Sequence, residues 1–253
     1  MSTQTMKINT KLYSRKVQKP NSYLLPGELT PNVTTVFCIV CVIVYILDIL
    51  TGYSLTTLGM KDNNMVINGG DTYRLFTCTL LHSGLIHLLS NIFFIRLYGN
   101  YTEFFYGHKK MAILILASGF TGSVFSLAFT DARSVGASGI AFGLVGAVLA
   151  ARYAMTKEER SKMTRNCIYL IIVNLLIGLI SGSIDNAAHI GGFLGGLMIG
   201  YGLSVYKETE RKFIKKVGIA AYFIVNIVVA LYAYTDIIPH VSINIWKILG
   251  MLF

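Results

Sequence analysis

Three short segments, far apart in the chain, contain side chains that could do chemistry in an apolar environment. They read HSGLIHLLSN from residue 82, GASG from 136 and AHIGGFLGG from 188. Their reactive or polar members are His82, His87, Asn91, Ser138 and His189. A hydroxyl nucleophile, an imidazole base and side-chain hydrogen-bond donors are the groups that acyl transfer requires. The segments therefore predict an acyl-transfer site, provided that the fold brings them together.

Each of these residues alone has an ordinary structural interpretation. His87 and Asn91 are four residues apart and share a helix face, but such a pair more often makes an interhelical hydrogen bond. A lone serine such as Ser138 usually bonds its own backbone, and a histidine such as His189 can simply bond a neighbouring carbonyl. The functional interpretation depends on all of them converging.

The composition indicates that a membrane must hold these segments. Of the 253 residues, 54% are hydrophobic and 13% are charged, whereas soluble domains have about 25% charged residues. Seven apolar blocks have the length of a spanning helix, about 17–25 residues. We therefore expect an all-α polytopic membrane protein. The predicted spans are residues 33–51, 83–102, 111–130, 137–155, 166–182, 187–206 and 217–235.

The basic residues predict the orientation of these spans. Lys61, Arg74, Arg133 and Lys247 fall on one side, and the remaining 18 of the 22 Lys and Arg residues fall on the side of the N-terminus. The positive-inside rule then places the N-terminus in the cytoplasm and the C-terminus outside. The net charge of +10 is explained by orientation and by contact with anionic lipid, so we expect no nucleic-acid partner. The polar residues 1–30 predict a cytoplasmic tail and no cleavable signal peptide.

This orientation brings the reactive residues to a similar depth. The second, fourth and sixth spans all begin at the outer face, and each carries its polar residues in its first turns. Intramembrane polar residues are costly and often functional. We expect them to line a polar cavity that is open to the outside and holds water for hydrolysis. The expected lining residues are His82, His87, Asn91, Ser138 and His189.

Glycines predict close contact between the fourth and sixth spans. Gly192, Gly196 and Gly200 follow His189 on one helix face, and Gly139, Gly143 and Gly146 follow Ser138. Small residues let helix backbones approach closely. We expect this packing to bring Ser138 Oγ within a hydrogen bond of His189, at about 2.6–3.2 Å.

The remaining features call for no cofactor. Cys38 and Cys41 have the spacing of a redox or zinc motif but fall inside the first span, and Cys78 and Cys167 form no second pair of this kind. We expect neither a disulfide nor a metal. The long outer loop, 52–82, mixes apolar and polar residues, and we expect it to be functional or folded and to lie partly in the membrane interface.

These motifs, in this order and on this side of the membrane, resemble the rhomboid family of intramembrane serine proteases. The stretch GGDTYRLFT from residue 69 resembles the outer-loop segment that ends in Trp-Arg in that family. The resemblance implies a rhomboid-like bundle of six transmembrane helices plus a seventh C-terminal helix. The implied divisions are a tail at 1–30, a catalytic core at 31–206 and the seventh helix with a short outer tail at 207–253.

The resemblance also implies a role for individual residues. Ser138 would be the nucleophile and His189 the general base of a dyad. His87, Asn91 and the backbone N–H of Ser138 would stabilise the oxyanion. His82 would order the loop or water near the site, Gly136 would leave room for the substrate backbone, and Arg74 would be structural. Gly139, Gly192 and Gly196 would support the packing of the two helices.

Three positions modify this picture. Phe142 stands where the family often has a tyrosine stacked on the catalytic histidine, and phenyl retains the stacking without the hydroxyl. Tyr73 stands where tryptophan is common. Asp185, four residues before His189, is positioned as a third triad member, but we expect a loop or capping role because family members act as dyads.

The implied activity is cleavage of single-pass transmembrane proteins near the outer face of a bacterial plasma membrane. Substrates would have a locally unstable helix and would enter between the second and fifth spans. A non-proteolytic rhomboid relative that binds membrane clients is one alternative, although such proteins typically lack the nucleophile or the base. A small transporter is another, but the chain shows neither the internal repeats nor the midplane polar site of that class. Substrate identity and oligomeric state stay open.

Overall fold

The computed structural model describes residues 32–182, 184–203 and 208–235. The described residues form helices, with one isolated antiparallel bridge between Lys61 and Ser134. The expected tail at 1–30 and the outer tail after the last helix fall outside the described residues. The described ranges contain seven longer helices, which make up the bundle: α2 (Val33–Leu50), α6 (Leu85–Tyr106), α7 (His108–Phe129), α8 (Ser138–Ala151), α9 (Lys157–Ser181), α10 (Asn186–Leu203) and α11 (Glu208–Thr235).

The expected all-α architecture is confirmed, and each predicted span corresponds to one of these helices. By length and composition, α2, α7, α9 and the part Lys212–Thr235 of α11 are able to cross a membrane. Arg74–Leu80 and α6 together would form a fifth membrane-crossing element, and the two parts meet at an angle of 95° at the break between them. The protein is therefore a multi-pass membrane protein. The α8 helix has 14 residues, a length of about 21 Å against a hydrocarbon layer of about 30 Å.

Helix α9 begins earlier than the apolar pattern predicted, at Lys157 rather than at 166. The reason is a capping box: the Thr156 side chain accepts from Glu159 N–H, and the Glu159 carboxylate accepts from Thr156 N–H. Such reciprocal capping nucleates a helix in a polar segment. A search for apolar residues detects the membrane part of a helix and misses its polar extension.

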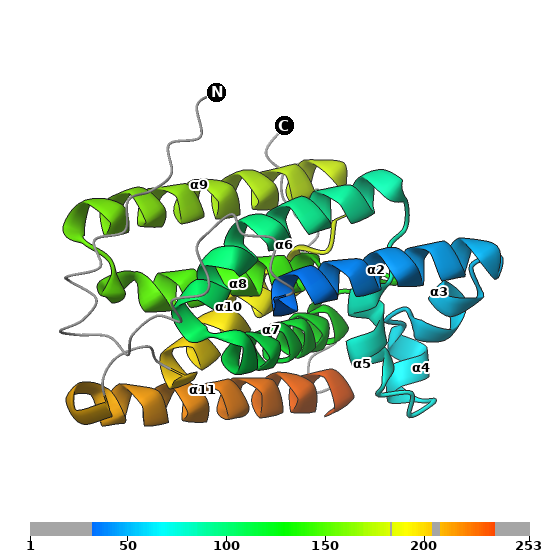
Figure 1. The fold of residues 1–253 in the computed structure, drawn as a ribbon. Helices are drawn as coiled ribbons and strands as arrows, with labels where there is room; N and C mark the ends of the chain where they lie inside the picture. The colour runs from blue at the N-terminus through cyan, green and yellow to red at the C-terminus, as the bar shows by residue number, and fades with distance from the viewer. Residues whose placement is uncertain (1–31, 183, 204–207, 236–253) are drawn as a thin grey trace, which may run out of the picture.

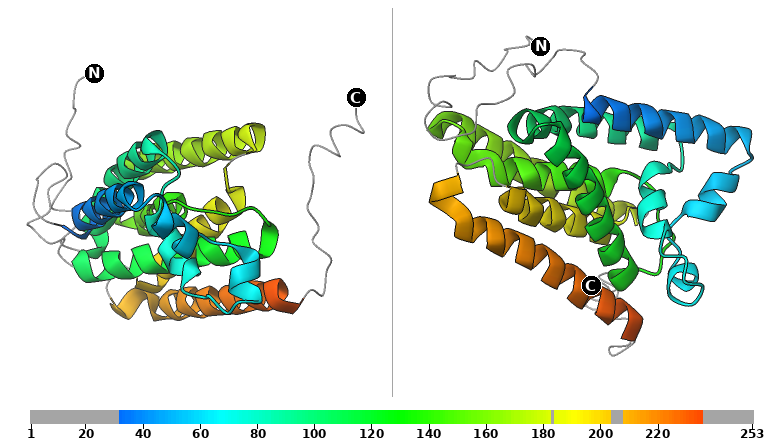
Figure 2. Two further views of the ribbon diagram at one scale, coloured as in Figure 1. Left: turned by 90° about the vertical axis from the view of Figure 1, so that its right-hand side faces the viewer. Right: turned by 60° about the horizontal axis from the view of Figure 1, so that its bottom comes forward.

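The helices are arranged around α8. Every residue of α8 except Ser138 is buried, as expected for a helix that is apolar on all sides. Helix α9 and helix α11 lie on opposite sides of the bundle, with α7, α8 and α10 between them (Figures 1 and 2). The outer helices expose large apolar side chains, including Ile43 on α2, Ile180 on α9 and Phe223 on α11. This distribution suits a bundle surrounded by lipid.

The outer loop between α2 and α6 is folded. It contains α3 (Ser54–Gly59), α4 (Asn63–Ile67), α5 (Arg74–Thr77) and a 3₁₀ turn, η1 (Cys78–Leu80), gathered at one end of the bundle (Figure 1). The structural role expected of Arg74 is confirmed, because its buried guanidinium donates to the carbonyls of Thr57 and Met60 and to Asp71. This loop therefore packs against one end of the bundle.

Candidate active site

The sequence places Ser138 at the first residue of α8. Before it, Gly136 has a φ of +130° and donates its N–H to Cys78 O at 2.9 Å. The N-cap residue, Ala137, makes no side-chain capping bond, so side chains leave the first-turn N–H groups of α8 free. Unpaired N–H groups and the positive end of the helix dipole therefore lie beside the Ser138 hydroxyl. This environment favours a developing negative charge.

His189 lies in the first turn of α10, 5% exposed. Asp185 caps this helix, because its carboxylate accepts from Ala188 N–H at 2.9 Å and its carbonyl accepts from His189 N–H at 3.2 Å. The second carboxylate oxygen accepts from Ser126 Oγ at 2.5 Å. The capping role expected of Asp185 is confirmed, and its carboxylate bonds these groups and not the imidazole.

The imidazole of His189 is held by an aromatic ring. Phe142, one turn into α8, stacks on it with ring centroids 4.2 Å apart and an interplanar angle of 11°. The stacking predicted for this phenylalanine is therefore confirmed. Nδ1 of His189 is buried and has no hydrogen-bond partner among the described residues. The stacked phenylalanine ring, and not a hydrogen bond at Nδ1, therefore orients this imidazole.

Glycines bring the two helices together as expected. A β-carbon on Gly192 would overlap the Gly139 carbonyl oxygen, and one on Gly196 would overlap the Gly143 carbonyl oxygen. One on Gly139 would lie 3.2 Å from Ala188 O. Backbone contact at these points fixes the starts of α8 and α10, and with them Ser138 and His189, at the same level.

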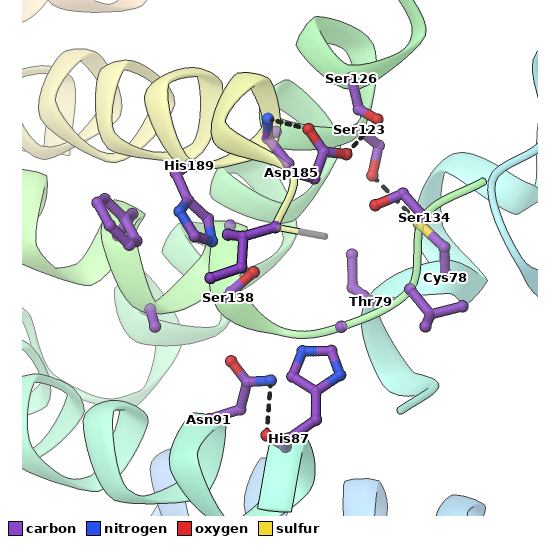
Figure 3. Close-up of a pocket in the computed structure, with 18 of the residues that line it drawn as sticks. Cys78, Thr79, His87, Asn91, Ser123, Ser126, Ser134, Ser138, Asp185 and His189 are labelled. Atoms are coloured by element: carbon purple, nitrogen blue, oxygen red, sulfur yellow. Dashed lines mark hydrogen bonds between the residues drawn. The ribbon is translucent and has the colours of Figure 1, made fainter. Parts of the chain in front are cut away.

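Helix α6 supplies the opposite wall. His87 and Asn91 lie across from Ser138, which stands between them and His189 (Figure 3). Ser83 Oγ lies 3.0 Å from His87 Nδ1, and Asn91 Nδ2 donates to His87 O at 3.0 Å. The Ser83 contact orients the His87 ring, and the side chains of His87 and Asn91 line the same cavity as Ser138.

These side chains line one cavity of about 710 Å³. Its lining includes Ser138, His189, His87, Asn91, Gly136 and Asp185. It also reaches Phe94 and Tyr98 of α6 and Leu170 and Asn174 of α9. The cavity therefore extends from the polar groups into the space between α6 and α9, and it has room for a peptide segment and water.

Comparison with known proteins identifies the fold that builds this cavity. Residues 69–206, more than half of the chain, match the family model for the Rhomboid domain. The chain belongs to the rhomboid family. The matched range includes all three motifs and the helices α6 to α10 that carry them.

Relatives of this rhomboid include a protein named as a protease and one named as inactive. It is 34% identical over 182 residues to Rhomboid protease GluP of Bacillus subtilis (strain 168), covering 70% of this chain and 36% of that protein. With RHOMBOID-like protein 1 of Arabidopsis thaliana it shares 36% identity over 151 residues, 58% of this chain and 39% of the relative. With Inactive RHOMBOID-like protein 8 of the same plant it shares 36% identity over 127 residues, which is 49% of this chain and 36% of the relative. The chain spans between about a third and a half of the length of these curated relatives.

The structure of this rhomboid differs from expectation at three points. The hydrogen bond expected between Ser138 Oγ and His189 is not among those of the described residues, although catalytic hydrogen bonds are often long without substrate. His82 does not line the cavity. It is 1% exposed and packs edge-on against His87, with centroids 5.2 Å apart, so it supports the His87 ring from behind. A β-carbon on Gly136 would lie 2.7 Å from His87 Cε1, so the missing side chain makes room for His87.

Sequence reasoning missed several residues of this rhomboid's site. Ser83 and Ser126, which contact His87 and Asp185, are serines among many, and no spacing rule singles them out. Lys61 also lines the cavity. It lies in a polar loop, where a lysine is ordinarily solvent-exposed, so no sequence signal predicted its burial.

Proposed function

We propose that this protein is an intramembrane serine endopeptidase that uses Ser138 and His189 as a catalytic dyad. The observation that carries the proposal is that both residues lie in the first turns of helices that are in backbone contact. Both also line one cavity, with His87 and Asn91 opposite. The family relationship supports the same activity, since one relative is named as a rhomboid protease. Ser138 and His189 come from separate motifs, and their meeting in one cavity is hard to explain by helix packing alone.

The proposed reaction follows from the chemistry of these groups. Ser138 Oγ attacks the scissile carbonyl while a ring nitrogen of His189 accepts the hydroxyl proton. The oxyanion forms near the Ser138 N–H, a ring nitrogen of His87 and the Asn91 amide, and its charge faces the N-terminus of α8. His189 then gives the proton to the leaving amine. Water from the cavity hydrolyses the acyl-enzyme in a second cycle of the same steps.

The proposed substrates are single-pass transmembrane proteins that enter from the lipid between α6 and α9. The cavity lining extends in that direction to Phe94 and Leu170, and α9 exposes apolar side chains along much of its length. A helix must unwind locally before its backbone can reach Ser138, which favours substrates with a weak helical segment. The proposed orientation, from the basic residues, has the N-terminus in the cytoplasm and the site near the outer face of a bacterial plasma membrane.

The alternative is a client-binding protein that has lost catalysis. One relative is named as inactive, so membership of the family does not by itself establish catalysis. This chain has a hydroxyl, an imidazole and the two proposed oxyanion donors in one cavity, which supports the protease.

The two functions are separated by purifying the protein in detergent and adding a fluorophosphonate probe and a generic single-pass substrate. Wild type is expected to label at Ser138 and to cleave. Ser138→Ala and His189→Ala should do neither, and Ser161→Ala, an exposed serine on α9, should behave as wild type. His87→Ala and Asn91→Ala are each expected to lower kcat by about 10²–10³-fold. Substrate binding by wild type without labelling or cleavage would establish client binding instead.

A further inference from the structure

Lys61 is the largest side chain that the described part of the chain buries completely, at 0% exposure. It lies between α3 and α4 in the outer loop. Lysine is almost never fully buried unless its charge is satisfied. Its ammonium donates to Asn63 Oδ1 at 2.9 Å, Thr130 O at 3.1 Å and Ala132 O at 2.7 Å, with Ser126 O at 3.4 Å.

These carbonyl partners belong to the end of α7 and the turn that follows it. The C-terminus of a helix carries a partial negative charge and unpaired carbonyls, so a buried ammonium there is both attracted and hydrogen-bonded. The residues that it binds also begin the segment 130–137, which leads directly to Ser138. The Lys61 side chain thus holds the start of the segment that presents the nucleophile.

The backbone of Lys61 holds the middle of the same segment. Lys61 N–H donates to Ser134 O and Ser134 N–H donates to Lys61 O, both at 3.0 Å. Gly136, two residues later, is fixed by its hydrogen bond to Cys78 O. Successive contacts at 130, 132, 134 and 136 leave the approach to Ser138 little freedom.

A second path leads from Lys61 to His189. Ser126, whose carbonyl faces the ammonium, donates its hydroxyl to Asp185, and Asp185 caps the helix that carries His189. Lys61 and Asp185 line the same cavity with opposite charges, which attract each other in a medium of low dielectric constant. One buried cation is therefore connected to the supports of both proposed dyad members.

We propose that Lys61 is a positioning residue of the active site, whose ammonium fixes the Ser138 segment and, through Ser126 and Asp185, the start of α10. This inference rests on the proposed function. Lys61 acts through these neighbours and touches no reacting atom. Its loss is expected to slow the chemical step more than it weakens substrate binding.

The test compares Lys61→Met, which keeps most of the volume and removes the charge, with Lys109→Met, the same change at an exposed lysine. The readouts are kcat and KM for a single-pass substrate, the rate of fluorophosphonate labelling, and the unfolding temperature in detergent. A misplacement of about 1 Å costs about 10²-fold in rate, so we expect Lys61→Met to lose between about 10-fold and 10²-fold in kcat. Its KM should change much less, and Lys109→Met should match wild type. A folded Lys61→Met with wild-type kcat and labelling would overturn the inference.

Two further variants keep the test decisive if Lys61→Met does not fold. Ser126→Ala removes only the hydroxyl that joins the two paths, so it should retain the fold and lose several-fold in kcat; an unchanged kcat contradicts the second path. Lys61→Ala should regain labelling when propylammonium is added but not with propanol. If Lys61→Ala folds but neither propylammonium nor propanol restores its labelling, the ammonium has no such role. A wild-type protein that does not label would instead reject the proposed function, and the inference with it.

Discussion

Phe142 lies flat against His189, with ring centroids 4.2 Å apart and planes 11° from parallel. The contact joins α8 to α10 one turn after Ser138. It limits rotation of the imidazole about the Cβ–Cγ bond of His189. An aromatic pair of this kind contributes about 0.5–1.5 kcal/mol beyond its buried area. Phe142→Ala is therefore expected to lower kcat roughly twofold to tenfold, measured as cleavage of a single-pass substrate.

Phe142→Tyr is the matched variant, because it keeps the ring and adds only a hydroxyl. It should retain at least most of the wild-type activity, and its unfolding temperature should stay close to that of wild type. Equal activity of Phe142→Ala and Phe142→Tyr would show that the stacked ring does not orient His189.

The outline of this site could be read from the sequence because its parts lie in regular helices. The orientation of the spans gives the depth of each helix in the membrane. The glycine faces at helical spacing then predict which helices pack closely, and so which side chains meet. The stacking of Phe142 and the capping role of Asp185 were predicted differently, from the resemblance to the rhomboid family, although each lies four residues from a proposed dyad residue. The roles of Ser138, His189, His87 and Asn91 in catalysis stay predictions until activity is measured.

The supporting contacts could not be predicted, because they join residues that are distant in the sequence and many of them come from the irregular outer loop. Lys61 binds carbonyls between 65 and 71 residues further along the chain, and no periodicity links such positions. His82 illustrates the same limit. Its place in the HSGLIHLLSN motif suggested a cavity residue, but the break before α6 turns it behind His87.

The contact between α8 and α10 predicts a large effect of adding one methyl group. A β-carbon on Gly196 would overlap the Gly143 carbonyl oxygen, and a rigid backbone cannot yield as a flexible side chain does. Gly196→Ala is therefore expected to destabilise the protein by at least about 1–3 kcal/mol and to reduce labelling of Ser138. Thermal unfolding in detergent and probe labelling measure the two effects.

Gly84→Ala provides the control for this substitution. A β-carbon on Gly84 meets no atom within 4 Å, so the same chemical change adds no overlap. It should leave the unfolding temperature nearly unchanged. Similar destabilisation by both variants would mean that loss of glycine flexibility matters, and not the close approach of α8 and α10.

Glu103, 1% exposed at the end of α6, is predicted to hold the start of α2. Its carboxylate accepts from Val33 N–H at 2.7 Å and from the N–H and hydroxyl of Thr34 at 2.9 and 2.5 Å. Glu103→Gln replaces one acceptor oxygen by a donor that faces other donors. We expect a loss of about 1.5–3 kcal/mol in unfolding free energy, measured by thermal unfolding.

The same change at an exposed glutamate tests whether burial is the cause. Glu158 is exposed in the first turn of α9 and does not take part in the hydrogen bonds of Glu103. Glu158→Gln should therefore have little effect on stability. Because Glu103 is not among the residues that line the cavity, folded Glu103→Gln should label with the probe at the wild-type rate. Slower labelling of the folded variant would contradict a purely structural role.

Asp62 in the outer loop is expected to contribute to the free energy of unfolding, and this contribution should disappear at low pH. Asp62 accepts from the N–H groups of Met65 at 3.2 Å and Asn64 at 3.0 Å and from Arg133 Nε at 2.8 Å. The hydrogen bond from Met65 N–H, followed by the contact with Arg133, lowers the pKa of this carboxyl below its ordinary value of 3.8. The charged form is therefore favoured by folding, and its contribution is present above pH 3.8 and is lost as the pH falls through the lower native pKa.

Asp62→Asn tests this contribution, since asparagine keeps a capping oxygen at the start of α4 but cannot ionise. The difference in unfolding temperature between wild type and Asp62→Asn should be full at about pH 6 and should shrink as the pH is lowered below about 4. Comparing the two proteins at each pH cancels the titration of the other carboxylates. A difference that stays constant down to about pH 2 would show that hydrogen bonding by the side-chain oxygen, and not its charge, stabilises the loop.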